Sequence, residues 1–128
     1  MTRDLITCGK PWEASALFSL GVGVEGKLLF TAGMTARDPE GRVVGAGDMR
    51  RQVEQCFENI GDVLRAAGAR WEQVVKVTMY VTDFDAFEGT RDIRARYLRG
   101  RPAATAVGVS RLIHPDMMFD IEAVAVLD

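Results

Sequence analysis

The alternation of apolar and polar positions along the chain predicts several strands. Between residues 73 and 82 the side chains alternate strictly, with Val75, Val77, Met79 and Val81 on one side and Lys76, Thr78 and Tyr80 on the other. Such alternation is typical of a strand with one buried face and one open face. Residues 16–24 and 28–33, separated by a Glu-Gly-Lys turn, predict a first β-hairpin. The last two strands are predicted at residues 103–109 and 117–127.

Two helices separate these strands. After Asp48, apolar residues recur at helical spacing and predict one buried helix face made of Val53, Cys56, Phe57, Ile60, Val63, Leu64 and Ala67. Asp48 is the predicted N-cap of this helix, and Gly68 is predicted to end it. A second helix is predicted from Asp83 or Asp85 to about Gly100. Its inward residues are predicted to be Phe87, Ile93 and Tyr97.

The predicted order is β-β-α-β-α-β-β, which makes residues 1–128 a single two-layer α+β domain. Two helices can cover only one face of the sheet. The residues predicted for the covered face are Val75, Val77, Met79, Thr105, Val107, Val109, Phe119, Ile121, Ala123 and Ala125. The residues predicted for the open face are Lys76, Thr78, Tyr80, Ala104, Ala106, Gly108, Asp120, Glu122, Val124 and Val126. Because a lone chain would expose Tyr80, Val124 and Val126 together, the pattern predicts an obligate homo-oligomer.

Composition excludes several classes of protein. The net charge of −2 gives no global field that would attract nucleic acid or an anionic membrane. No apolar stretch approaches the roughly 20 residues of a membrane span, and the N-terminus lacks the apolar run of a signal peptide. Cys8 and Cys56 do not form a disulfide framework, and Cys56 is predicted to be a small buried hydrophobe. The expected compartment is therefore the cytoplasm.

The strongest candidate chemistry is a pair of carboxylates in the last strand. Asp120 and Glu122 are two residues apart, so both side chains leave the same sheet face. Both are candidates for acid–base catalysis or for positioning water, with Asp120 the stronger catalytic candidate and Glu122 a candidate substrate-binding residue. The structural alternative is that one or both pair with Lys76 or with an arginine across an interface.

Small residues on the neighbouring strand bear on this choice. If Ala104, Ala106 and Gly108 lie on the open face, they leave a groove floor without bulky side chains. Such a groove, with a carboxylate at its edge, would suit a small-molecule ligand. Equally, small residues there would simply admit side chains from a partner.

Other polar residues point to no further site. His114 is the only histidine, lies in a turn, and has no neighbouring Cys or His, so neither a metal site nor a cofactor is expected. Five arginines near the end of the second helix spread around it, namely Arg91, Arg94, Arg96, Arg99 and Arg101. A solvated helix end explains them better than recognition of an acidic ligand. RNA binding is not expected, because no aromatic stacking pattern accompanies them.

Long segments of the chain resemble one known family. They are LLFTAG, DPEGRVVGAGD, RRQVEQCFENIGDVLRAAG, VVKVTMYVTD and RPAATAVGV…LIHPDMMFDIEAVAV. In this order, from about Phe18 to Val126, they are similar to the Rid family, also called YjgF, whose members are often labelled L-PSP endoribonuclease. The resemblance implies a chorismate-mutase-like α+β fold, a homotrimer with a central barrel, and clefts between subunits.

The resemblance also implies an activity: hydrolysis of reactive enamines and imines to a carbonyl compound and ammonia, without metal or organic cofactor. In that chemistry an arginine holds the substrate carboxylate, and a carboxylate with backbone groups positions water. Asp120 falls where the family has its water-positioning glutamate. Gly33 falls at the glycine of the second strand, after Ala32, where the family has a serine.

At other positions implied for the cleft, the chain departs from the family. The arginine is replaced by Ala104 and the nearby cysteine by Ala106. Phe18 takes the place of a tyrosine, unless a one-residue offset puts Ser19 there, and Arg91 replaces an asparagine. Loss of the arginine should weaken binding of an imino acid by about 1.5–3 kcal/mol.

Three functional hypotheses remain from the sequence. The first is a hydrolase of imines that lack a carboxylate at the usual place, or whose carboxylate Arg91 binds from another direction. The second is a trimer that binds a small molecule or regulates without catalysis. The third and weakest is an endoribonuclease.

Overall fold

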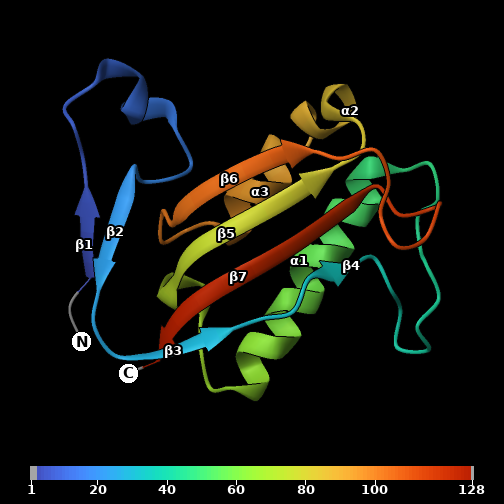
Figure 1. The fold of residues 1–128 in the computed structure, drawn as a ribbon, viewed down its shortest axis with the longest axis horizontal. Helices are drawn as coiled ribbons and strands as arrows, with labels where there is room; N and C mark the ends of the chain where they lie inside the picture. The colour runs from blue at the N-terminus through green and yellow to red at the C-terminus, as the bar shows by residue number, and fades with distance from the viewer. Residues whose placement is uncertain (1–2, 128) are drawn as a thin grey trace.

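The computed structural model describes residues 3–127 and has a five-stranded sheet with helices on one face (Figure 1). In spatial order its main strands are β3 (Lys27–Phe30), β7 (Phe119–Leu127), β5 (Val74–Val81) and β6 (Ala103–Gly108). The short strand β4 (Met34–Thr35) also pairs with β7. Only β5 and β6 run parallel to each other. This arrangement confirms the predicted α+β class and the two-layer build.

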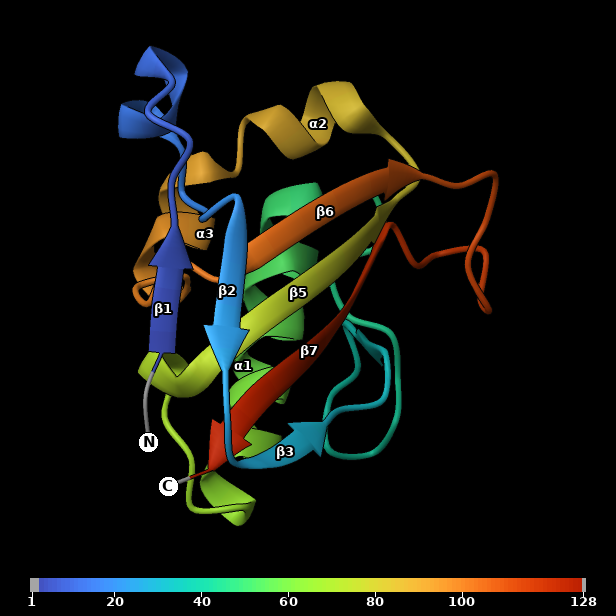
Figure 2. The same cartoon turned by 60° about the vertical axis from the view of Figure 1, so that its left-hand side comes forward.

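The predicted N-terminal hairpin is wrong. Strand β2 (Gly21–Val24) pairs with an additional strand, β1 (Arg3–Ile6), while β3 pairs with β7 and places Phe30 opposite Val124. Figure 2 shows the β1–β2 ribbon standing beside the starting end of β5, which β2 contacts. The apolar pattern locates the two strands but does not name their partners, because hydrogen bonding between strands uses only backbone groups.

Helix α1 (Met49–Ala66) carries most of the core. As predicted, the Asp48 side chain caps it by accepting a hydrogen bond from the Arg51 amide, and Gly68 follows its end with a φ of 74°. The buried residues of α1 are Met49, Gln52, Val53, Cys56, Phe57, Ile60, Gly61 and Leu64. The Phe57 ring lies between other aromatic rings, with centroid distances of 5.0 Å to Tyr97 and 6.1 Å to Phe119. The covered side of the sheet is therefore closed by one amphipathic helix.

The predicted second helix is interrupted. It forms two short helices, α2 (Phe84–Glu88) and α3 (Arg91–Tyr97). At the break the Phe87 carbonyl accepts hydrogen bonds from both the Thr90 amide at 3.0 Å and the Thr90 hydroxyl at 2.6 Å, in a tight i→i+3 turn. Phe87 and Ile93 are buried as predicted. Two short 3₁₀ helices, η1 (Pro11–Ser15) and η2 (Trp71–Gln73), complete the regular structure.

The register of the sheet decides which face each residue of β6 occupies. Ala104 pairs with Val77 and Ala106 with Met79, and both alanines pack against the buried core. Gly108 faces α2, because a Cβ there would lie 3.3 Å from the Phe84 ring. The prediction that these three small residues lie on the open face is therefore wrong.

On β6 the open face carries Thr105 and Val107 instead, which were predicted to be covered. Both sets of residues on this strand are small or apolar, so alternation alone cannot orient it. The small set lies inward because it lets α2 and α3 approach closely.

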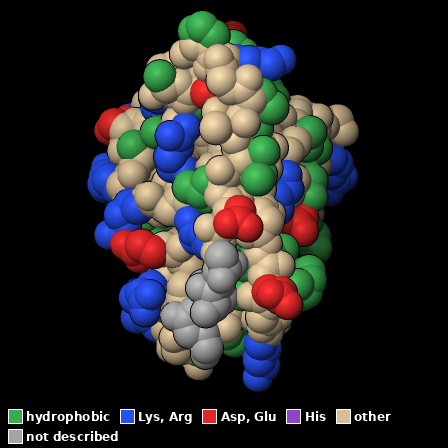
Figure 3. Space-filling view, turned by 90° about the vertical axis from the view of Figure 1, so that its left-hand side faces the viewer, with side chains coloured by type: hydrophobic (Ala, Val, Ile, Leu, Met, Phe, Trp, Pro, Cys, Tyr) green, Lys and Arg blue, Asp and Glu red, His purple; other side chains and the backbone are tan. Residues whose placement is uncertain are grey.

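The open face is less exposed than its sequence predicts. Val126 is fully buried within the single chain, and Tyr80 and Val124 are only partly exposed. The most exposed apolar residue on this face is Phe30, which is 69% exposed. Figure 3 shows, on the side of the β1–β2 ribbon, charged side chains of both signs among hydrophobic ones. No helix among residues 3–127 has the length and hydropathy to span a bilayer.

A buried glutamine ties α1 to the loop before β7. The Gln52 amide donates to the Asp116 carbonyl at 2.7 Å and accepts from the Met118 amide at 2.7 Å. We expect Gln52→Leu to lower the free energy of unfolding by about 2–4 kcal/mol, because both backbone groups lose their partner. Urea denaturation measures this. Gln55→Leu on the more exposed side of α1 is the control and should change stability by about 1 kcal/mol or less; equal effects would contradict the assignment.

Candidate functional site

The carboxylate of Asp120 occupies an unusual position on the open face of β7. Its Cα pairs with Thr35 on β4 and with Tyr80 on β5, so it lies between two neighbouring strands. The side chain is half-buried, and its Oδ1 atom is buried without a hydrogen-bond partner. Burial, and secondarily the charge of Glu122, raise the pKa of Asp120 above its usual range. The protonated form of this carboxyl group is therefore more favoured than that of an exposed aspartate.

Gly33 lies directly against this carboxylate. A Cβ at position 33 would be 2.7 Å from Asp120 Oδ1 and 3.1 Å from Oδ2, so no other residue fits without displacing Asp120. The φ of Gly33 is not positive, so the requirement for glycine comes from this close approach and not from the backbone conformation. The preceding Ala32 is exposed, and its carbonyl accepts a hydrogen bond from the Thr31 hydroxyl. The structure thus brings Gly33 and Asp120 together, as a shared site requires.

Glu122 has a different partner from the one predicted. The Tyr80 hydroxyl donates to Glu122 Oε1 at 2.5 Å. Lys76 donates instead to the Thr105 hydroxyl at 2.8 Å, so the structural alternative in which Lys76 pairs with one of these carboxylates does not hold within the chain. The hydrogen bond to Glu122 is the main cause that raises the pKa of Tyr80. Alternation places Tyr80 on the open face, but its bond to Glu122 depends on the β5–β7 register, which the sequence does not contain.

No cation of residues 3–127 neutralises this pair. None of the ion pairs in this part of the chain includes Asp120 or Glu122. Over the same residues, the His, Cys, Asp and Glu side chains do not gather into a group that could hold a metal ion. The site can therefore exchange protons, but it lacks a local group that would grip an anionic substrate.

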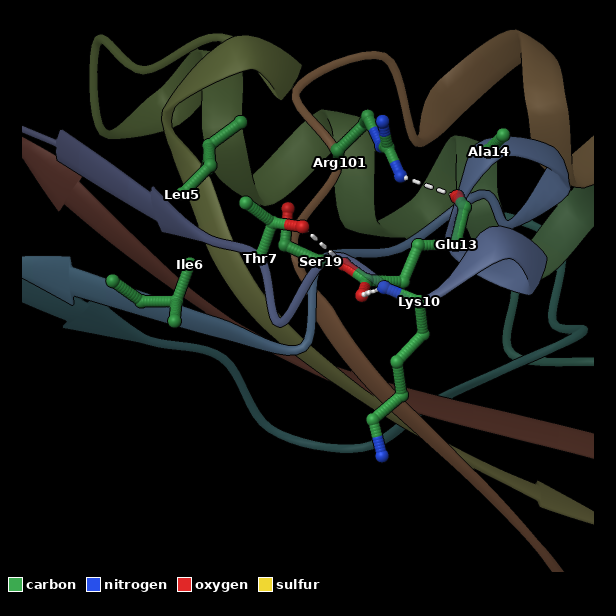
Figure 4. A pocket seen from close by; sticks show the side chains of 8 residues that line it. All are labelled: Leu5, Ile6, Thr7, Lys10, Glu13, Ala14, Ser19 and Arg101. Atoms are coloured by element: carbon green, nitrogen blue, oxygen red, sulfur yellow. Dashed lines mark hydrogen bonds between the residues drawn. The ribbon is translucent and has the colours of Figure 1, made fainter.

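A separate pocket of about 310 Å³ lies at the base of the N-terminal segment (Figure 4). It is lined by Leu5, Ile6, Thr7, Lys10, Glu13, Ala14, Ser19 and Arg101. The Glu13 carboxylate accepts hydrogen bonds from the Thr7 hydroxyl and from the Cys8 and Lys10 amides, and the Thr7 bond is the main cause that lowers the pKa of Glu13. The Glu13 carboxylate thus links Thr7, Cys8 and Lys10 within the N-terminal segment.

This pocket is distant from the carboxylate pair. Ser19 bridges to Ala103 at the start of β6, whereas the β6 residue level with Tyr80 and Asp120 is Val107. Four residues of strand separate Ala103 from Val107, which is about 13 Å. The pocket and the Asp120 site are therefore separate places within one chain.

Comparison with known proteins shows which family this chain resembles in sequence and in fold. A sequence model described as Endoribonuclease L-PSP matches residues 9–127. A RutC family protein of Pyrococcus abyssi is 34% identical over 126 residues, covering 98% of each chain. A crystal structure of YyfB, a protein of the conserved Rid family from Yersinia pestis, superposes with a TM-score of 0.86 at 32% identity, covering 99% of this chain and 100% of that one. The chain belongs to the Rid family.

The same family includes relatives with a named activity. The 2-iminobutanoate/2-iminopropanoate deaminase of Rattus norvegicus is 27% identical over 124 residues, covering 97% of this chain and 90% of that protein. The predicted membership and fold are thus confirmed.

Several residues singled out by the Rid resemblance do not meet Asp120 within the chain. Phe18 lies in the N-terminal segment, 6.3 Å from the Trp12 ring centroid, and its carbonyl accepts from Arg101. Arg91 is exposed and donates to the Ser15 carbonyl of the same segment. Ala104 and Ala106 face the helices. Phe18 and Arg91 could therefore meet an Asp120 side chain only from a second chain, and the two alanines lie on the opposite face of the sheet from Asp120.

The remaining arginines near α3 also have partners within the chain. Arg94 lies 4.1 Å from the Phe87 ring centroid, Arg96 pairs with Glu54 at 3.2 Å, and Arg99 pairs with Glu72 at 3.4 Å. Structural contacts therefore account for this cluster. The prediction that Cys56 is a small buried hydrophobe is confirmed, since the residue is fully buried and burial raises the pKa of its thiol. His114 is exposed.

The contact between Gly33 and Asp120 gives a direct test. We expect Gly33→Ala to lower the free energy of unfolding by about 1–3 kcal/mol, because the new methyl group overlaps the Asp120 carboxylate. In an Asp120→Ala background the same substitution should cost much less, and a double-mutant cycle measures the difference. Gly23→Ala is the control, since a Cβ there meets only ordinary contacts at 3.7 Å or more. Additive effects of the two substitutions would contradict the contact.

Proposed function

We propose that the protein hydrolyses an imine or enamine, releasing ammonia and a carbonyl product, with Asp120 as its catalytic residue. The observation that carries this proposal is the half-buried Asp120 carboxylate, with its partnerless Oδ1 and raised pKa. A raised pKa brings a carboxyl group closer to the range in which it both accepts and returns a proton near neutral pH. Membership of a family that includes an iminobutanoate/iminopropanoate deaminase supports the reaction class.

The proposed steps balance as a simple hydrolysis. Asp120 accepts a proton from water as the water oxygen bonds to the imine carbon, and passes that proton to the imine nitrogen, which gives a neutral carbinolamine. Asp120 then accepts the proton of the carbinolamine hydroxyl as the C=O bond forms, and gives it to the nitrogen as the C–N bond breaks and ammonia leaves. Exposed backbone at Ala32 and Gly33 lies beside the carboxylate and would orient the water or the substrate.

The surroundings of Asp120 favour a substrate without a carboxylate at the reacting end. No cation of residues 3–127 is paired with the site, and the neighbouring open-face residue of β6 is the apolar Val107. Arg91 would have to come from another subunit to bind an acidic group here. A substrate less acidic than a simple 2-imino acid is therefore proposed.

We propose further that the working form is a homotrimer, with its ligand in a cleft between subunits. The open face displays Leu28 and Phe30 on β3, which are 44% and 69% exposed although they lie in a sheet. Burial of these side chains against sister chains would remove this apolar area from water. Phe18 and Arg91 could contribute to the ligand site only in such an assembly, whereas Ala104 and Ala106 face the helices of their own chain.

A second function is favoured by the missing cation. Without a group that grips an anionic substrate, the same surface would serve as a non-catalytic ligand-binding or regulatory site. The endoribonuclease named in the family description has less support here, since the arginines near α3 are engaged with other parts of the chain.

Ammonia release tests the catalytic proposal. The substrates are freshly generated imines, some with a carboxylate and some without. The protein should accelerate their hydrolysis over the spontaneous rate, and most strongly for imines without a carboxylate. Asp120→Asn should lower kcat by about 10²–10⁴-fold, because the amide cannot accept the proton. Asp116→Asn, a change of an exposed loop carboxylate, should leave the rate unchanged. Specific binding of an imine analogue without any acceleration would favour the regulatory function instead.

Sedimentation tests the assembly. The protein should sediment at about three times the chain mass of 14.1 kDa. Phe30→Glu should shift this equilibrium toward monomer, because it places a charge in the proposed interface. Ile113→Glu is the matched control, since Ile113 is 77% exposed but lies in the loop before β7. A wild-type protein that stays monomeric at micromolar concentration would overturn the trimer and its cleft.

A further inference from the structure

The two carboxylates on β7 are chemically unequal although they share one face. Glu122 Oε1 accepts a hydrogen bond from the Tyr80 hydroxyl at 2.5 Å, whereas Asp120 Oδ1 is buried with no partner. A donor stabilises the charged form of a carboxylate, and burial without a donor destabilises it. When one proton is available to the pair, it therefore favours Asp120.

The strand register makes Tyr80 the residue that creates this difference. Tyr80 on β5 pairs across the sheet with Asp120, and the next open-face residue along β7 is Glu122. The phenol thus stands beside one carboxylate while its hydroxyl is bonded to the other. The difference between the two carboxylates therefore follows from the position of the Tyr80 ring, and not from the difference between an Asp and a Glu side chain.

We propose that Tyr80 is a positioning residue, which engages Glu122 through its hydroxyl and leaves Asp120 as the member of the pair that exchanges a proton with the ligand. This assignment rests on the proposed imine hydrolysis for its catalytic meaning. The hydrogen-bond geometry on which it stands is independent of any activity.

Few other charged groups act on the pair. Asp120 interacts electrostatically with Glu122 on its own strand and with Tyr80 on β5. It also interacts through the sheet with the thiol of Cys56 on α1, and burial raises the pKa of that thiol. On the open face of β5, Lys76 is bonded to Thr105 on β6. The partner residues on β4 and in the β3–β4 connection, Thr35 and Gly33, do not titrate.

The chain contains only two tyrosines, which gives a matched experiment. Carboxyl carbon resonances, followed by NMR as a function of pH, report the titration of Asp120 directly. In Tyr80→Phe the ring stays but the donor is lost, so the environments of the two carboxylates become more alike and Asp120 loses its advantage as the proton-binding member. We expect the Asp120 midpoint to fall by about half a pH unit or more. Tyr97→Phe removes the other hydroxyl, which is on α3, and should leave that midpoint unchanged.

Glu122→Gln provides a second, independent variant. Without the neighbouring negative charge the Asp120 midpoint should also fall, and Tyr80→Phe added to this variant should shift it no further. The phenol of Tyr80, followed by ultraviolet absorbance in a Tyr97→Phe background, should ionise at lower pH once Glu122 is replaced. An Asp120 midpoint that is the same in wild type and Tyr80→Phe, or that rises, would overturn the proposal.

Kinetics separate this inference from the proposed function. If imines are hydrolysed, the acidic limb of the kcat profile should move to lower pH in Tyr80→Phe by the same amount as the NMR midpoint, with KM little changed. If the wild-type protein hydrolyses no imine while the NMR midpoints shift as expected, the proposed reaction fails and the role of Tyr80 in the pair stands.

Discussion

The packing of α1 against one face of β5 and β7 is the constraint on which the rest of the molecule depends. The apolar face of this helix, centred on Phe57, covers alternate residues of both strands. Full burial of each large apolar side chain contributes roughly 1.5–3 kcal/mol, so reversing the sheet would forfeit the core. Once Val77 and Ile121 face the helix, Tyr80, Asp120 and Glu122 must face the other way.

This constraint places acidic groups on a surface that is otherwise rich in apolar residues. A half-buried carboxylate with a partnerless oxygen is costly, and neither a nearby cation of residues 3–127 nor a full hydrogen-bond set offsets that cost at Asp120. The close approach of Gly33 shields the carboxylate further. Such an arrangement stores an unfavourable interaction at one point of a well-packed domain, which is common where a group must react.

The N-terminal segment is held in place by a different kind of interaction, hydrogen bonds from arginine side chains to backbone carbonyls. Arg91 and Arg101 donate to its backbone carbonyls, and Arg3 bonds to carbonyls of Glu72 and Gly100. These contacts fix the segment beside α3 and the start of β6, and they account for arginines that the sequence alone left open to ligand binding. Hydrogen bonds with this segment thus engage arginine side chains that would otherwise be candidates for binding an anion.

The sequence by itself determined the α+β class, helix α1 with both of its ends, strand β5, and the shared face of Asp120 and Glu122. Each of these follows from local periodicity or from a cap, and neighbouring residues are enough to express it. The partners of β2 and β3, the inward face of β6, and the bond between Tyr80 and Glu122 were decided only by the tertiary structure. Pairing between strands joins backbone groups far apart in the chain, and a strand such as β6, apolar or small on both sides, carries no signal of its own orientation.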